Sequence, residues 1–153
     1  MVPPQRFSDV RCAVHLYLFV ETDAGFTIPV AARLRYDLRT PYAVYLDSHV
    51  DQERPVTWMF GRDLLIRGVE GFAGEGDVAV WPVRPTGRVG ERVYLSLQAH
   101  GTSVLLWAGA EEVRDFLRLA ACVALPGLER EHYDMDALID RLIDPPPPED
   151  GPW

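Results

Sequence analysis

The stretch VRCAVHLYLFV at residues 10–20 decides the fold class of this 153-residue chain. It is rich in β-branched and aromatic side chains with two polar interruptions, which is typical of a β-strand. A turn signal at residues 21–25 separates it from a second extended run at residues 26–36. Pro29 inside that run predicts an edge position or a bulge, because proline has no N–H to donate to a neighbouring strand.

Further strand patterns continue along the chain. Alternation at residues 42–50 places Val44 and Leu46 on one face of a strand and Tyr45 and Asp47 on the other. Similar runs predict four more strands, at residues 56–60, 77–83, 92–99 and 103–108.

Three helices are expected between and after these strands. A short one at residues 62–67 has Gly68 as its C-terminal stop. The next shows an apolar stripe at helical spacing, made of Val113, Phe116, Leu117, Ala120 and Ala124. The last begins at Asp134 as its N-cap, and its stripe consists of Met135, Leu138, Ile139, Leu142 and Ile143.

This order of elements predicts an α+β fold built on antiparallel β-sheet, with a short middle helix and two C-terminal helices. The pattern allows a repeated unit of strands followed by a helix, although no residue-level repeat is found. We expect one domain at residues 10–144. Residues 1–9 are expected to be a flexible extension and residues 145–153 a disordered proline-rich tail.

Composition indicates a soluble protein of the cell interior. No apolar run approaches the ~20 residues that a membrane-spanning helix needs. Residues 1–9 lack the apolar centre of a secretion signal. Cys12 and Cys122 form no CxxC motif, so neither a disulfide framework nor a zinc site is predicted, and both are expected to be buried.

The net charge of −8 is unevenly distributed along the chain. Residues 1–108 carry eleven Arg against twelve Asp or Glu, whereas residues 109–153 carry four Arg against eleven acidic residues. The sequence therefore predicts a nearly neutral body with an acidic C-terminal third.

No motif for catalysis, cofactor binding or metal binding stands out. Residues 74–76 resemble a fragment of a phosphate loop, but they precede a strand and would repel phosphate, so a turn is predicted. The four histidines are scattered, without metal-ligand spacing. We therefore expect no enzymatic activity. The weakest alternative is an enzyme that uses the acidic cluster, which helix capping also explains: Glu131, His132, Asp134 and Asp136.

Two basic patches lie near aromatic residues and suggest a second class of function, a single-stranded nucleic-acid binder. The overall acidic charge disfavours that alternative, since nucleic-acid binders present a dominant basic face. The first patch contains Arg33, Arg35 and Arg39, and the second contains Arg84, Arg88 and Arg92 with Trp81 and Tyr94.

Several short strings, in order along residues 10–144, resemble the SsgA-like proteins of sporulating actinomycetes. Each string is weak alone, but the ordered set is specific, and a basic content made only of Arg fits a GC-rich genome. The strings are LRYD at residues 34–37, PYAV at 41–44, Trp58 with FGRDLL at 60–65, GEGDV at 74–78, WP at 81–82, FL at 116–117, and His132 with Asp134 and Asp136.

The resemblance implies a non-enzymatic role in cell division and sporulation, in the cytoplasm at the division septum. One subgroup of the family is understood to bring the tubulin-like GTPase FtsZ to future division sites. FtsZ and another SsgA-like protein are therefore the expected partners, with no cofactor. The family fold implies two antiparallel sheets of about four strands each, similar to the Whirly type of nucleic-acid binder, assembled as a trimer.

The charge distribution suggests where such a partner would bind. FtsZ proteins are acidic as a family, so the acidic C-terminal third should repel this partner. Basic and aromatic residues of the neutral body are the predicted contact instead: Trp81, Arg84, Arg88 and Arg92.

Overall fold

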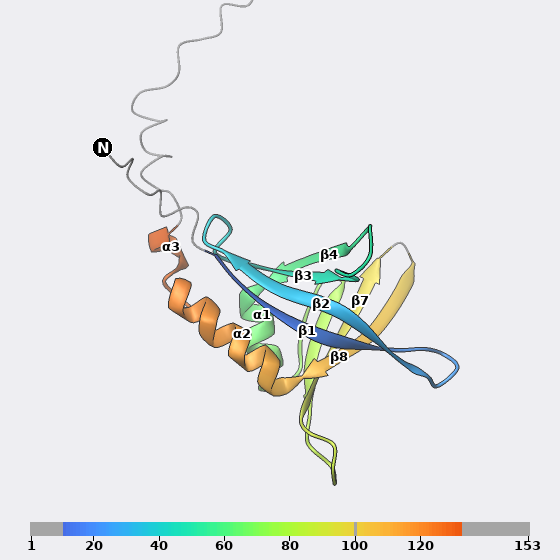
Figure 1. Ribbon diagram of the computed structural model, residues 1–153. Helices are drawn as coiled ribbons and strands as arrows, with labels where there is room; N and C mark the ends of the chain where they lie inside the picture. The colour runs from blue at the N-terminus through green and yellow to red at the C-terminus, as the bar shows by residue number, and fades with distance from the viewer. Residues whose placement is uncertain (1–10, 100, 133–153) are drawn as a thin grey trace, which may run out of the picture.

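The computed structural model describes residues 11–99 and 101–132 and contains two strand-rich units, each followed by a helix (Figure 1). The first unit comprises β1 (Arg11–Glu21), β2 (Thr27–Asp37), β3 (Ala43–Ser48), β4 (Val56–Gly61) and α1 (Arg62–Gly68). The second comprises β5 (Ala73–Glu75), β6 (Val78–Val83), β7 (Arg92–Ala99), β8 (Thr102–Gly109) and α2 (Ala110–Val123), followed by the short α3 (Glu129–His132).

All eight described strands belong to one antiparallel sheet, in the order β4-β3-β2-β1-β8-β7-β6-β5. This differs from the two separate sheets that the family resemblance implied. The physical reason is a narrow seam, where Phe19 pairs with Trp107 and Val20 with Leu106. We call β1–β4 the N-terminal half and β5–β8 the C-terminal half. Each half is a four-stranded meander, so the repeated unit suggested by the sequence is present, while a likeness to the Whirly fold remains a prediction.

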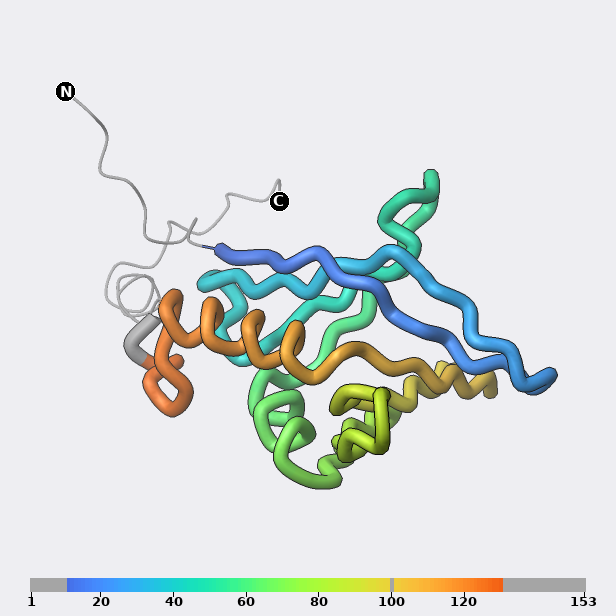
Figure 2. Tube along the Cα trace, turned by 60° about the horizontal axis from the view of Figure 1, so that its bottom comes forward, coloured from blue at the N-terminus to red at the C-terminus, as the bar shows by residue number. Residues whose placement is uncertain are grey.

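Strict alternation of side chains separates the two faces of the sheet. In β1, Leu16 and Leu18 are buried, whereas His15 and Tyr17, at the alternate positions, are exposed. The alternation predicted for β3 is confirmed, with Val44 and Leu46 on the buried face. The sheet curls around this inner face, which α1 and α2 cover (Figure 2).

The helix α2 forms because its apolar residues recur on one side. Val113, Phe116 and Ala120 are buried against β1 and β8, and Glu111 and Glu112 occupy the first turn, where carboxylates favour the helix dipole. The predicted stripe is therefore confirmed.

Gly68 ends α1 as expected, but for another reason than backbone freedom. A Cβ atom at Gly68 would lie 2.3 Å from Cγ1 of Val80, so only glycine lets α1 approach β6 this closely.

Two local expectations are refined. The strand that contains Pro29, β2, is not an edge strand, because it lies between β1 and β3. However, β3 pairs only with residues 32–35 of β2, so Pro29 has a neighbouring strand on one side only, which suits its missing N–H. Of residues 74–76, Gly74 and Glu75 form part of β5, and Gly76 makes the turn with a φ of +59°.

Several expectations concern residues outside the described part of the chain. These are the N-terminal extension at residues 1–9, the last helix with its cap Asp134, the acidic residue Asp136 and the proline-rich tail. No described helix has the length and apolar character needed to cross a membrane.

Candidate partner-binding surface

The outer face of the C-terminal half carries a row of aromatic side chains. The row follows one line of directly paired residues across four strands, because Trp81 pairs with Tyr94, Tyr94 with Trp107 and Trp107 with Phe19. Residues that oppose each other on one face of neighbouring strands are in side-chain contact. Phe72, just before β5, stacks on Trp81 and extends the row by one ring.

Two contacts along the row join rings with nearly parallel planes, whereas the Tyr94 and Trp107 rings between them are tilted by 38°. The ring centroids are 4.2 Å apart for Phe19 and Trp107 and 5.9 Å apart for Trp81 and Tyr94, with interplanar angles of 17° and 12°. Offset stacking of this kind adds to the stabilisation from burial. Because the stacked rings cover parts of one another's faces, the row has fewer free ring faces for an incoming group than isolated rings would have.

Arg92 covers part of the row. Its guanidinium carbon lies 3.7 Å from the centroid of the Trp107 ring, a cation–π geometry. The Tyr94 hydroxyl donates a hydrogen bond of 3.1 Å to the Glu21 carboxylate. Trp107 Nε1 is buried and has no hydrogen-bond partner among the described residues.

An open hollow of about 430 Å³ lies at the β5 end of the row and is lined by Gly71, Phe72, Trp81 and Pro82. The β6–β7 hairpin continues directly from it and projects beyond the sheet (Figure 1). Arg84 and Arg88 lie on this hairpin, and no described carboxylate forms an ion pair with either side chain.

The structure thus divides the four predicted contact residues into two pairs. Trp81 and Arg92 belong to the stacked row, whereas Arg84 and Arg88 extend along the hairpin arm. Sequence reasoning missed Phe19 and Trp107, because these rings are distant in the sequence and only strand register aligns them. It also missed Phe72, which lies outside the strands and reaches Trp81 by stacking. Aromatic residues at alternating strand positions were the available signal.

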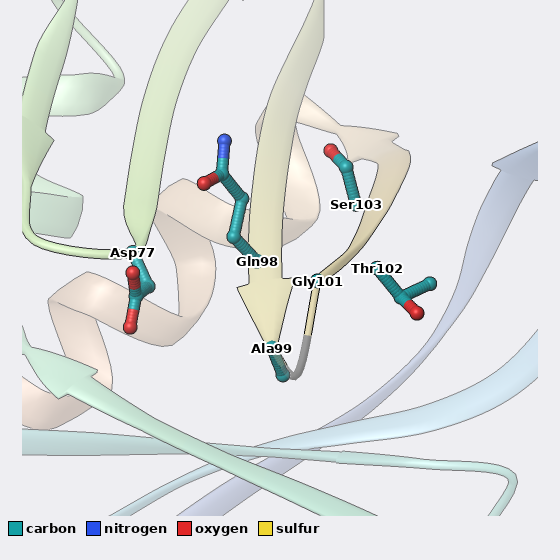
Figure 3. Close-up of a pocket in the computed structure, with 6 residues that line it drawn as sticks. All are labelled: Asp77, Gln98, Ala99, Gly101, Thr102 and Ser103. Carbon is teal, nitrogen blue, oxygen red and sulfur yellow. The ribbon is translucent and has the colours of Figure 1, made fainter.

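A second hollow, of about 360 Å³, lies where the β7–β8 hairpin meets the start of β6. It is lined by Asp77, Gln98, Ala99, Gly101, Thr102 and Ser103. Its polar side chains point in different directions and do not converge on one position (Figure 3). A ligand site needs a few convergent polar groups, so this hollow is not our candidate.

The first basic patch is partly neutralised by carboxylates of the same face. Arg33 and Arg35 donate hydrogen bonds of 2.8 and 2.7 Å to Oδ2 of the buried Asp47, and Thr57 donates to Oδ1. Burial raises the pKa of Asp47, but these donors outweigh it and lower the pKa to about 2. Since the arginines are paired, this patch has little charge to offer a phosphate backbone.

The chain matches the sequence family described as Streptomyces sporulation and cell division protein, SsgA, over residues 30–129. The protein belongs to the SsgA family.

Several of its relatives are named sporulation-specific cell division protein SsgB. The Streptomyces coelicolor protein is 37% identical over 134 residues, covering 88% of this chain and 95% of the relative. The Kineococcus radiotolerans protein is 39% identical over 142 residues, covering 92% of this chain and 83% of the relative.

Solved structures agree with this assignment. A structure from work on SsgB mutations and longitudinal cell division in sporulating Streptomyces coelicolor superposes with a TM-score of 0.75 at 35% identity, covering 82% of this chain and 98% of that one. An SsgA-like sporulation-specific cell division protein from Thermobifida fusca gives a TM-score of 0.78 at 28% identity, covering 88% and 97%.

The strings that signal the SsgA family have a structural explanation in this chain. Arg62, from the FGRDLL string, is 1% exposed and donates a 2.7 Å hydrogen bond to Glu129. It also donates to the carbonyl oxygens of Ala120 and Ala124 at the end of α2, where the negative end of the helix dipole favours a cation. Tyr36, from the LRYD string, lies against the same guanidinium, 4.7 Å from ring centroid to guanidinium carbon.

This buried cluster joins the two units, and the groups around Glu129 change the pKa of its carboxyl. Burial raises the pKa of Glu129, but the hydrogen bond from Arg62 and the local backbone N–H groups lower it overall. Arg62 Nε has no hydrogen-bond partner among the described residues. We assign the cluster to the architecture of the SsgA-family domain.

Groups that could serve chemistry or bind a metal are sparse in the described part of the chain. No group of three or more His, Cys, Asp or Glu side chains is placed to hold a metal ion there. Cys12 is half-buried, and burial raises the pKa of its thiol. Cys122 is exposed, so the expectation that both cysteines are buried is wrong for Cys122.

Proposed function

We propose that this SsgA-family protein is a non-enzymatic adaptor that brings FtsZ to septum sites and also binds a second SsgA-like protein. The observation that carries the proposal is the 37% identity to the sporulation-specific cell division protein SsgB across almost the whole of both chains. The aromatic row, the open hollow and the unpaired arginines provide a plausible contact. Aromatic residues and arginine are the residue types enriched among interface anchors.

Charge supports placing FtsZ on this surface, at Trp81, Arg84, Arg88 and Arg92. The exposed Glu111 and Glu112 at the start of α2 would repel an acidic partner, whereas Arg84 and Arg88 would attract it. In this proposal the acidic helical side faces solvent or the second partner.

Co-sedimentation with FtsZ polymers tests the proposal through paired charge reversals. Arg84→Glu with Arg88→Glu should abolish co-sedimentation, whereas Glu111→Arg with Glu112→Arg should retain it. Arg92 is left unchanged because its contact with Trp107 gives it a structural role. Retained binding by the first variant and loss by the second would place FtsZ on the helical side instead, and no binding by the unmodified chain would overturn the proposal.

Single-stranded nucleic-acid binding is the second candidate, favoured by the aromatic row beside Arg92. Two observations oppose it. The rings already stack on one another, and the chain has a net charge of −8. We expect negligible binding of a single-stranded oligonucleotide at physiological salt, and tight binding in a fluorescence titration would promote this candidate.

The family resemblance also leads us to propose self-association as a trimer. Exposed apolar side chains such as Tyr17, Phe26 and Ile28 fit a chain that buries surface in an assembly. Sedimentation equilibrium at micromolar concentration should give about three times the 17.2 kDa chain mass, and a clean monomer would contradict this.

A further inference from the structure

The hollow at the β5 end of the aromatic row resembles a pocket for one side chain. Its lining is apolar, and Phe72, which forms one wall, is 75% exposed. An exposed ring of this size is unfavourable in water unless something covers it. Pockets of this kind accept the central anchor of a partner, while polar contacts around them set specificity.

The hairpin adds a line of positive charge that begins beside the hollow. Arg84 follows the lining residue Pro82 by two positions, so their Cα atoms are about 7 Å apart at most. Arg88 lies at the tip of the hairpin, where Thr86 and Val89 bond to each other, up to about 20 Å from the hollow. The acidic residue of the same loop, Glu91, is held by Arg114 through two hydrogen bonds.

Many arginines of the described chain are paired with a carboxylate. These are Arg33, Arg35, Arg39, Arg62, Arg67, Arg114 and Arg118. Arg84 and Arg88, like Arg54 and Arg92, form no such ion pair among the described residues, so the charge of the hairpin is available to a partner.

We propose that the hollow and the hairpin arm together bind an extended acidic peptide segment carrying one large apolar side chain. With the apolar side chain in the hollow, an extended strand rising about 3.3 Å per residue brings acidic positions to Arg84 and Arg88 at about two and six residues from the anchor. A narrow arm that projects beyond the sheet suits an extended segment better than a flat folded surface (Figure 1). This inference rests on the proposed adaptor function and names the chemistry of the partner segment.

The test is a selection from a random peptide display library on the immobilised full chain, with no FtsZ present. We expect the enriched peptides to share one aromatic or large aliphatic residue followed or preceded by acidic residues at the spacing above. A labelled peptide from this set is then titrated by fluorescence anisotropy. Phe72→Ser, and Arg84→Glu with Arg88→Glu, should each weaken its binding about tenfold or more.

Matched controls separate this surface from general effects of polarity and charge. Met59→Ser removes another largely exposed apolar side chain, from the N-terminal half, and Arg54→Glu with Arg118→Glu reverses two exposed charges elsewhere. Both should leave the peptide affinity unchanged. Absence of enriched peptides, a neutral or basic consensus, or equal loss in the controls would overturn the inference. The peptide selection contains no FtsZ, so its outcome does not depend on the co-sedimentation assay. Failure of the adaptor proposal and failure of this inference can therefore be told apart.

Discussion

The two halves of the sheet have similar inner faces but different outer faces. Each is a four-stranded meander whose inner face packs under a helix. On the outer face of the N-terminal half, Arg33, Arg35 and Thr57 all donate to Asp47, so its polar groups satisfy one another. The outer face of the C-terminal half instead holds stacked aromatic rings and a hairpin with two unpaired arginines. The comparison suggests that one outer face mainly stabilises the domain and the other mainly serves a partner.

The strongest test concerns the joint between the units, on which both halves depend. Arg62→Met should lower the free energy of unfolding by about 3 kcal/mol, because it leaves the buried Glu129 and the end of α2 without their cation. Denaturant unfolding followed by circular dichroism measures this. Arg62→Met with Glu129→Gln should recover part of the loss, and a cost below about 1 kcal/mol for the single variant would show that the joint is dispensable.

The second test concerns the contact between α1 and the C-terminal half. Gly68→Ala should lower the free energy of unfolding by about 2–3 kcal/mol. The new Cβ would lie 2.3 Å from Cγ1 and 2.4 Å from Cβ of the buried Val80. Gly71→Ala is the matched control, because nothing lies within 4 Å of a Cβ there. Equal unfolding midpoints for the two variants would contradict the close approach.

The third test asks whether the outer face of the N-terminal half is stabilising. Asp47→Asn should lower the free energy of unfolding by about 2 kcal/mol at neutral pH. This follows because folding lowers the pKa of Asp47 from 3.8 to about 2. Because the folded pKa is lowered, this stabilisation is present above pH 4 and is lost as the pH falls towards 2. Unfolding midpoints of the two proteins should therefore converge across this window, and a constant difference between them would rule out Asp47 ionisation as the cause.

The smallest effect is expected at the surface assigned to the partner. Phe72→Ser and Met59→Ser should each change the free energy of unfolding by no more than about 0.5 kcal/mol, because both side chains are largely exposed. Only Phe72→Ser should weaken partner binding. A large loss of stability for Phe72→Ser alone would mean that the aromatic row is structural, and the contrast between the halves would disappear.

Prediction from sequence succeeded where a pattern is local. The alternation of β3 and the stripe of α2 follow from neighbours a few positions apart, and both are confirmed. The reason for Gly68 was missed, because the atom that excludes a side chain belongs to Val80, on another element. The contact at Trp81, Arg84, Arg88 and Arg92 stays a prediction, and the rings beside Trp81 come from strands that only pairing brings together.

The family, the positions of most strands and the inward-facing residues of each element can be predicted from the sequence alone. These depend on side-chain type and on a period of two or 3.6 residues, which any short window contains. Tertiary structure alone decided that the halves form one sheet, that Arg62 reaches Glu129 67 positions away, and that four rings form a row. Register and partner choice are set by contacts between distant segments, and no local pattern encodes which strand will lie beside which.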